Sequence, residues 1–187
     1  SPSSNTDKPF YVLSGPGAKA TGTASNVRLS SVARSTSLPT SKFTSDSDTE
    51  LLVCQSNRFV DNGPDGHTIT TTAGASVTSF GPFLTSAVYD AAVNGASAYF
   101  DGSGDRLHTP EDASTRVAAS NFTFEAWVYP TTTTTSQKMI FTQGAPGVYS
   151  PFNVYVQGTT VRIYISINGT SWNIASNSTS SNSVQIN

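Results

Sequence analysis

Four oxygen-bearing side chains are spaced as in a loop that wraps a hard cation. In the segment DGSGDRLHTPED they occupy positions 1, 3, 5 and 12 of such a loop: Asp101, Ser103, Asp105 and Asp112. Alternating oxygens of this kind are typical Ca²⁺ ligands. However, Arg106 stands where the loop needs glycine, and Asp112 is shorter than the glutamate that usually closes it. The alternative interpretation is a glycine-rich hairpin with polar residues at its tip.

Glu125 raises the question of glycoside hydrolysis. That reaction generally needs two carboxylates on either side of the scissile bond, and acids two or four residues apart on a strand would share one face. Glu125 has no acidic partner at positions 123, 127 or 129. The strand-like segments 138–143, 151–157, 160–166 and 172–176 also contain no Asp or Glu. We therefore expect a protein without enzyme activity.

Aromatic side chains are the third group that could do chemistry, because flat rings stack on the apolar faces of sugars. Trp127 and Tyr129 share one face of a predicted strand with Glu125, and Tyr155, Tyr164 and Trp172 lie near predicted hairpin turns. We take four of them as candidate glycan-binding residues: Trp127, Tyr129, Tyr164 and Trp172. The alternative is that these rings pack in hydrophobic cores.

The composition indicates what must position these residues. Of 187 residues, 36% are hydrophobic and only 12% are charged, while Ser, Thr, Asn and Gly supply the polar balance. Strand formers and turn formers dominate, and long helical runs are absent, so the sequence predicts an all-β domain. The ten Lys and Arg residues are scattered and the net charge is −2. This argues against a nucleic-acid partner, and no apolar run approaches the ~20 residues of a membrane span.

From residue 51 the chain alternates short strand-like runs with turn signals. We predict strands at 51–55, 67–72, 75–79, 96–101, 105–109, 121–129, 138–143, 151–157, 160–166, 172–176 and 183–187. Such spacing is typical of an antiparallel sandwich or jelly roll. In NFTFEAWVYP one face of the predicted strand carries Phe122, Phe124, Ala126 and Val128, and the other carries Thr123, Glu125, Trp127 and Tyr129. Asn168-Gly169 predicts the turn of a hairpin. Cys54, the only cysteine, reads as a small buried hydrophobe.

The motifs GASAYFDGSGDRLHTP and NFTFEAWVYP, taken with TELLVCQSNRFVDNGPDGHTITTTAGASVTSFGPF upstream of them, resemble the laminin-G-like, concanavalin-A-like jelly roll. The resemblance is closest to the versions found in structural proteins of tailed phages, especially marine ones. It covers residues 49–187 and implies an antiparallel jelly-roll sandwich. Domains of this type usually continue beyond SVQIN with further strands, so the resemblance also implies that the usual last strands are lacking.

Residues 1–48 have a different character. Strand candidates lie at 10–13 and 26–33, and the rest reads as loop and linker. The segment resembles the last strand and exit linker of a preceding jelly roll, so the chain is either an excerpt of a tandem array or an arm followed by a domain. As an arm, residues 1–48 would complete this sandwich or that of a neighbouring subunit by adding to an open edge.

The resemblance implies a non-enzymatic structural or adhesion protein on a virion surface, such as a capsid decoration, a tail fibre or another appendage. Its expected partners are other virion proteins, copies of itself, or glycans of the host surface. The lack of an internal disulfide agrees with an extracellular protein of bacterial or viral origin. The alternatives are a calcium-dependent, lectin-like module of a non-viral extracellular protein and, less favoured, a glycoside hydrolase.

Overall fold

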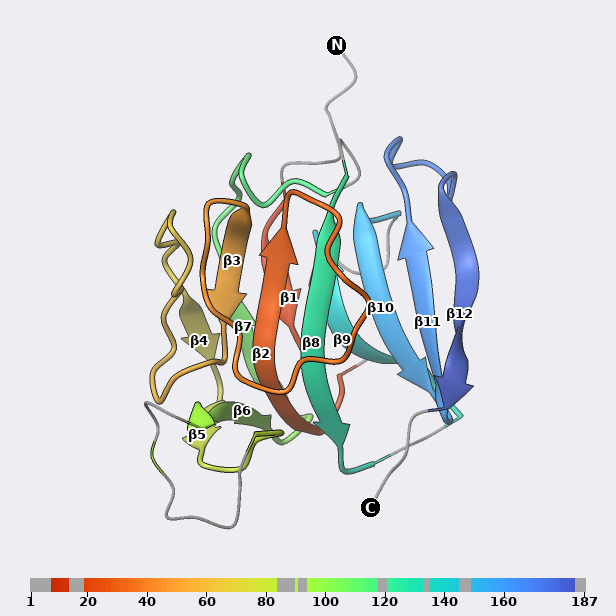
Figure 1. The fold of residues 1–187 in the computed structure, drawn as a ribbon. Helices are drawn as coiled ribbons and strands as arrows, with labels where there is room; N and C mark the ends of the chain where they lie inside the picture. The colour runs from red at the N-terminus through yellow and green to blue at the C-terminus, as the bar shows by residue number, and fades with distance from the viewer. Residues whose placement is uncertain are drawn as a thin grey trace.

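The computed structural model describes residues 8–13, 19–83, 90, 94–117, 121–132, 135–144 and 149–183. In these residues the chain is all-β and forms two antiparallel sheets that share one core, as in a β-sandwich (Figure 1). The strands, in chain order, are β1 (Phe10–Val12), β2 (Gly22–Ser30), β3 (Thr49–Val53), β4 (Thr70–Thr72), β5 (Ser76–Thr78), β6 (Ser97–Phe100), β7 (Arg106–His108), β8 (Thr123–Pro130), β9 (Lys138–Gln143), β10 (Phe152–Gln157), β11 (Thr160–Ile165) and β12 (Ala175–Ser183).

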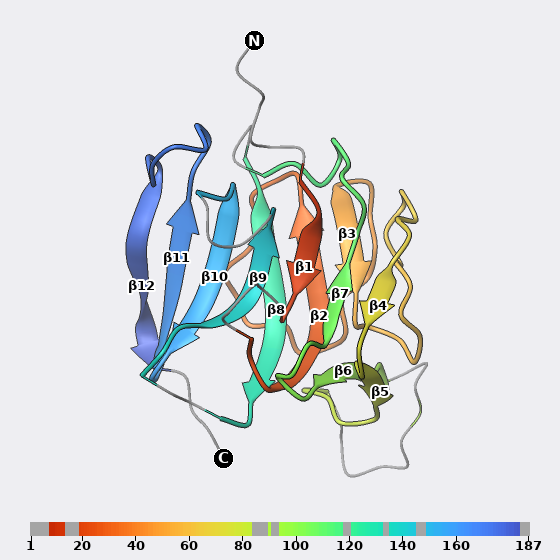
Figure 2. The same ribbon diagram turned by 180° about the vertical axis from the view of Figure 1, so that it is seen from behind.

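The larger sheet has the strand order β12-β11-β10-β9-β1-β7-β4. Seen from behind, β9, β1 and β7 form its centre, and β10, β11 and β12 continue to one side (Figure 2). The pairing of β10 with β11 is regular from Phe152 opposite Ile165 to Gln157 opposite Thr160. This register fixes which side chains of the two strands share a face.

The smaller sheet is built around β2. Residues 22–24 pair with β6 on one edge and with β8 on the other, and β3 pairs with residues 27–30. A bulge interrupts the pairing with β8 between Ser25 and Arg28, and within it Asn26 adopts a left-handed conformation with φ of 49°. Asn26 donates its backbone N–H to the Cys54 carbonyl, so the bulge remains hydrogen-bonded.

The predicted two-faced character of β8 is confirmed. Phe122, Phe124, Ala126 and Val128 pack against the core, and the ring of Phe124 lies 4.2 Å from that of Phe141 on β9. Burying one such aromatic side chain contributes about 1.5–3 kcal/mol to stability. Because side chains alternate along a strand, this packing forces Glu125 and its neighbours to the outer face.

The N-terminal strands pair with strands that follow residue 48. β1 lies between β7 and β9 in the larger sheet, and β2 contacts β3, β6 and β8 in the smaller one. The boundary drawn at residue 48 stays a prediction. What the structure adds is that Phe10 and Val27, from this segment, are buried members of the shared core.

Several boundaries differ from those predicted, most clearly at the start of β2 and near the end of the chain. β2 begins at Gly22 instead of residue 26, and a single β12 replaces the two predicted strands 172–176 and 183–187, of which residues 184–187 lie outside the described part of the chain. The hairpin predicted around Asn168-Gly169 is confirmed, since β11 pairs antiparallel with β12 and Gly169 has φ of 69°.

Candidate functional site

The structure places the four candidate glycan-binding residues in two separate clusters. Trp127 and Tyr129 lie on the outer face of β8, where each packs against one phenylalanine of the segment between β5 and β6. The ring of Trp127 meets Phe83 edge-on at 5.6 Å, and Tyr129 lies 5.1 Å from Phe80. These contacts resemble a small secondary core, which was the alternative interpretation of this pair.

Tyr164 of β11, in the larger sheet, instead meets Trp172 of the loop between β11 and β12. Their ring centroids are 5.2 Å apart, Tyr155 lies 5.7 Å from Tyr164, and Tyr149 lies 5.2 Å from Trp172. The four rings form a continuous row, which we call the aromatic row (Tyr155, Tyr164, Trp172 and Tyr149). Tyr149 is 40% exposed and ends the row at the surface.

Strand alternation explains why Tyr155 and Tyr164 lie on the outer face. In β10, Val154 and Val156 point into the core, so Tyr155 points outward. In β11, Ile163 and Ile165 pack against the core, so Tyr164 points outward with Arg162. In the register of the two strands Tyr155 lies opposite Arg162, which places Tyr164 on the diagonal from Tyr155.

A polar network borders the aromatic row. Gln137 Nε2 donates a hydrogen bond to the hydroxyl oxygen of Tyr164. The O–H of Tyr164 in turn donates to Asn177 Oδ1 at 3.0 Å. Arg162 Nη1 donates to the same oxygen of Asn177 at 2.5 Å. Burial, and then the neighbouring Tyr164, raises the pKa of Tyr155, so its hydroxyl stays protonated at neutral pH. We call the row and these three polar residues (Gln137, Arg162 and Asn177) the aromatic face.

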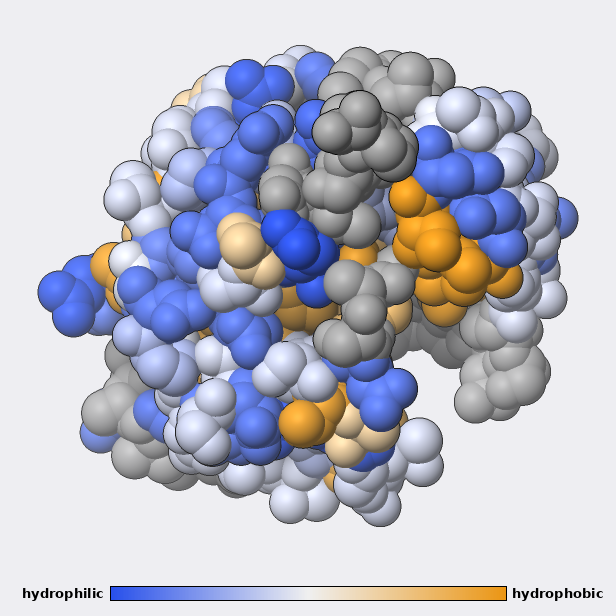
Figure 3. Space-filling model, turned by 90° about the horizontal axis from the view of Figure 1, so that it is seen from above, coloured by the Kyte–Doolittle hydropathy of each residue, from blue (hydrophilic) through white to orange (hydrophobic). Residues whose placement is uncertain are grey.

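Exposed apolar residues lie in the same loop as Trp172. In the loop between β11 and β12, Ile167 is 40% and Ile174 58% exposed. In the view from above, apolar surface is visible on the side of β10–β12 (Figure 3). The loop that carries Trp172 thus also carries two exposed apolar side chains.

Only part of the aromatic face was predicted. Tyr155, Tyr164 and Trp172 were noted as rings near hairpin turns, but Tyr149, Gln137, Arg162 and Asn177 were missed. Arg162 lies two residues before Tyr164 on a strand, so the period of two could have placed it on the same face. Nothing in the sequence indicates that Asn177, on another strand, would join them.

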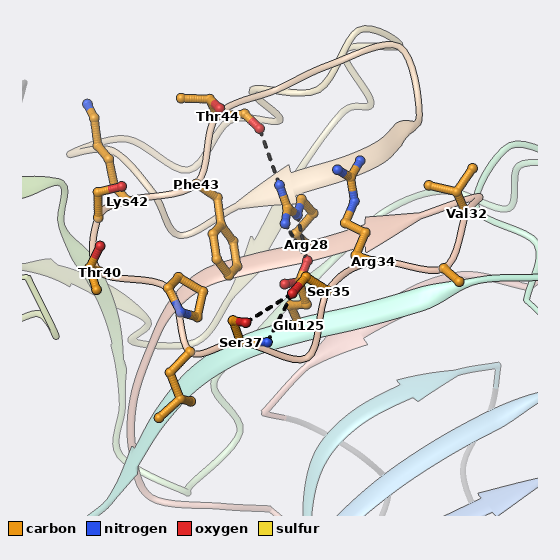
Figure 4. A pocket seen from close by; sticks show the side chains of 14 residues that line it. Arg28, Val32, Arg34, Ser35, Ser37, Thr40, Lys42, Phe43, Thr44 and Glu125 are labelled. Atoms are coloured by element: carbon orange, nitrogen blue, oxygen red, sulfur yellow. Dashed lines mark hydrogen bonds and ion pairs between the residues drawn. The ribbon is translucent and has the colours of Figure 1, made fainter.

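Glu125 lies in a different environment, on the outer face of the smaller sheet. Its carboxylate accepts hydrogen bonds from Nε and Nη2 of Arg28, at 2.8 and 2.5 Å, and the two side chains are only 17% and 11% exposed. Both line an open cavity of about 530 Å³ between β2, β8 and the segment that follows β2 (Figure 4). The other residues lining this cavity include no Asp or Glu. Glu125 is therefore placed as the partner of an arginine, and no second carboxylate lines this cavity among the described residues.

Residues 31–48 cross the outer face of β2 and β8, and we call them the strap (Figure 1). Phe43 of the strap lies under the Arg28 guanidinium, with Cζ 4.3 Å from the ring centroid, and donates its backbone N–H to Asn26 Oδ1. Arg34 pairs with both oxygens of Asp46 at 2.8 and 2.6 Å, which holds the pKa of that carboxyl well below its usual range. The strap thereby covers Glu125 and ties itself across the sheet.

The residues of the predicted Ca²⁺ loop make hydrogen bonds that stabilise turns. Asp105 is buried and accepts from the backbone N–H groups of Gly74 and Asp101, while Asp101 accepts from the N–H of Ser103. Asp112 accepts from Ser114. Among the described residues, no group of three or more His, Cys, Asp or Glu side chains is arranged to hold a metal ion. These contacts favour the hairpin interpretation of the loop, and the Ca²⁺ site stays a prediction.

Ser114, His67 and Asp112 come together although the sequence shows no recognisable Ser-His-Asp motif. Ser114 Oγ lies 3.0 Å from His67 Nε2, but it also donates to Asp112 Oδ1 at 2.9 Å. The closest approach of Asp112 to His67 Nδ1 is 4.0 Å, too long for a hydrogen bond. In a catalytic triad the carboxylate orients the imidazole instead of the serine. The arrangement here joins two loops and lacks the order of contacts that a nucleophile needs.

Comparisons of the chain with models of protein families, with curated proteins and with solved structures find no match. The resemblance of its motifs to phage jelly rolls therefore stays an interpretation of the sequence. In the described residues, no helix is long and apolar enough to cross a membrane.

Proposed function

We propose that this protein is a non-enzymatic adhesion module that binds glycans through the aromatic face. The observation that carries the proposal is a row of four rings, open at Tyr149, bordered by hydrogen-bonding groups of Gln137, Arg162 and Asn177. Sugars offer apolar ring faces and hydroxyl groups side by side. Binding sites for such ligands combine aromatic walls with a few placed polar groups.

We further propose that the fold is a jelly roll of the laminin-G, concanavalin-A type and that the protein works on a virion surface, as a decoration, fibre or appendage. This setting rests on the resemblance of the motifs, which is an argument from analogy. Its partners would then be other virion proteins, further copies of the chain and host glycans. The pairing of Glu125 with Arg28 supports the non-enzymatic part of the proposal.

A pair of tryptophan variants tests the binding role, because the chain holds two tryptophans in separate places: Trp127 on β8 and Trp172 in the loop between β11 and β12. Affinity electrophoresis through gels containing single polysaccharides, neutral and acidic, would compare the native protein with Trp172→Ala and Trp127→Ala. We expect Trp172→Ala to weaken binding about tenfold, which corresponds to ~1.4 kcal/mol. Trp127→Ala should retain the native affinity within about twofold.

The opposite ranking of the two variants would move the site to β8, and unaltered binding by both would contradict the role of the aromatic face. Circular dichroism of each variant checks that the sheets remain folded. Repeating the measurement with a calcium chelator tests the lectin-like alternative, in which Asp101, Ser103, Asp105 and Asp112 would hold a required Ca²⁺. We expect the chelator to leave binding unchanged, because these carboxylates already bind backbone N–H groups and Ser114.

A further inference from the structure

Charge is distributed unevenly along the chain. All twelve Asp and Glu residues lie at or before Glu125. The 62 residues that follow it contain two cations, Lys138 and Arg162, and no acid. The strands that build the aromatic face, β10, β11 and β12, all belong to this acid-free part of the chain. An anion that approaches the aromatic face therefore meets side chains of a segment that carries positive charge and no Asp or Glu.

Arg162 is the charged group at the centre of this region. Its guanidinium donates through Nη1 to the neutral amide oxygen of Asn177, and its Nε is buried without a hydrogen-bond partner. Arg162 forms no ion pair among the residues that the structure describes, whereas Arg28 and Arg34 are each paired with a carboxylate. A partly buried charge without a counter-ion is unfavourable. A bound anion would relieve this cost.

The aromatic face and its neighbour Asn153 offer more hydrogen-bond donors than acceptors. Asn177 Oδ1 already accepts from both Arg162 and Tyr164, and Tyr164 already accepts from Gln137. On the same face, opposite Tyr164, Asn153 is 1% exposed and its Nδ2 has no partner, while its Oδ1 is used by Thr142. Buried donors without acceptors are rare and costly. A ligand group that only accepts hydrogen bonds suits this face better than a hydroxyl, which also donates.

We propose that the aromatic face selects acidic saccharides, with a sugar carboxylate paired to the guanidinium of Arg162 and sugar rings lying along the aromatic row. This inference rests on the proposed glycan-binding function and specifies its ligand class. The planar guanidinium matches a carboxylate in geometry, and a charge-assisted hydrogen bond is about twice as strong as a neutral one. A neutral sugar would keep the stacking on Trp172 but lose this pairing.

The test compares polygalacturonate, which carries a carboxylate on each sugar, with dextran, which is neutral. We expect the native protein to bind polygalacturonate at least about tenfold more tightly than dextran, and Arg162→Gln to remove this preference. The affinity for polygalacturonate should fall as NaCl is raised, because salt screens an accessible ion pair. Arg58→Gln is the matched control, since it removes the same charge from an exposed residue of the other half of the chain.

Each outcome separates this inference from the function on which it rests. Equal binding of both polymers, weakened by Trp172→Ala, would overturn the acidic preference and leave glycan binding in place. Equal losses in Arg162→Gln and Arg58→Gln would show general charge attraction and would also overturn the inference. Tight binding of dextran sulfate but not of polygalacturonate would overturn the carboxylate as the ligand group and indicate a sulfate ester as the partner of Arg162. Binding of none of these polymers would contradict both proposals.

Discussion

Arg28 and Arg162 both project from the outer face of a sheet, yet their surroundings differ. Arg28 lies between the carboxylate of Glu125 and the ring of Phe43, beneath the strap. Arg162 lies beside two tyrosines and meets only a neutral amide oxygen. On the smaller sheet the charge of Arg28 is paired with a carboxylate of the same chain. On the larger sheet no carboxylate among the described residues pairs with Arg162. A charge paired within the chain contributes to stability, whereas a charge without a carboxylate partner is suited to binding a ligand.

The largest effect is expected at Asn26, which joins the strap to the bulge of β2. Asn26→Ala removes the acceptor of the Phe43 N–H, which is buried, and places alanine in a left-handed conformation. We expect a loss of about 3 kcal/mol of unfolding free energy, measured in urea. Burial raises the pKa of the Cys54 thiol to about 12, so a thiol reagent should label native protein slowly and the variant faster. Unchanged stability would mean that the strap is held elsewhere.

A smaller loss is expected when Glu125 is replaced by the neutral glutamine. In the native protein the two groups pair at 2.5 Å and are little exposed. In the variant Arg28 keeps its charge beneath the strap but has lost this carboxylate. We expect Glu125→Gln to lower the unfolding free energy by about 2 kcal/mol. A loss below about 0.5 kcal/mol would show that water reaches the pair and that this face is less closed than its contacts indicate.

Acid should loosen the strap by a still smaller amount. Because Arg34 lowers the pKa of Asp46 in the folded protein, the pair contributes stability at neutral pH and loses it as the pH falls below the ordinary value of about 4 toward the lowered one. The pair is partly exposed, so we expect about 0.5–1 kcal/mol. The gap in stability between native protein and Asp46→Asn should narrow from pH 6 to pH 2. A gap that stays constant would exclude this linkage.

Arg162→Gln should have the smallest effect on stability and the clearest contrast with Arg28. Removing a charge that has no carboxylate partner costs little, so we expect the unfolding free energy to change by less than about 0.5 kcal/mol, or to rise. Urea denaturation without ligand gives the value. A loss as large as that of Glu125→Gln would indicate that Arg162 serves the fold instead of a ligand.

The sequence predicts those parts of the fold that depend on neighbouring residues. Alternation along 121–129 gives the two faces of β8, and Asn168-Gly169 gives the β11–β12 hairpin. The start of β2 was missed because Gly-Thr-Ala-Ser reads as a loop. Gly22 is needed there because a Cβ would overlap the carbonyl of Tyr129 on β8, a contact between residues far apart in the chain.

The candidate site was predicted less completely, for the same physical reason. Aromatic residues could be recognised by type, but pairing decides which of them cooperate. The pairing of β10 with β11 joins Tyr155 to Tyr164, whereas Trp127 meets Phe83 in a separate cluster. Likewise, the sequence shows that Glu125 lacks an acidic neighbour, but only the pairing of β2 with β8 reveals Arg28 as its partner.

The part of the strap around Leu38, which we call its tip, is a place where the chain could be cut by a protease. Leu38 is 81% exposed, and the residues around it are polar, as at sites where proteases cut and insertions are tolerated. A cut at this tip would separate β1 and β2 from the remaining strands. Because β1 lies inside one sheet and β2 inside the other, neither fragment could close the sandwich alone. The two pieces should therefore reassemble only with each other, as a pair of complementing fragments.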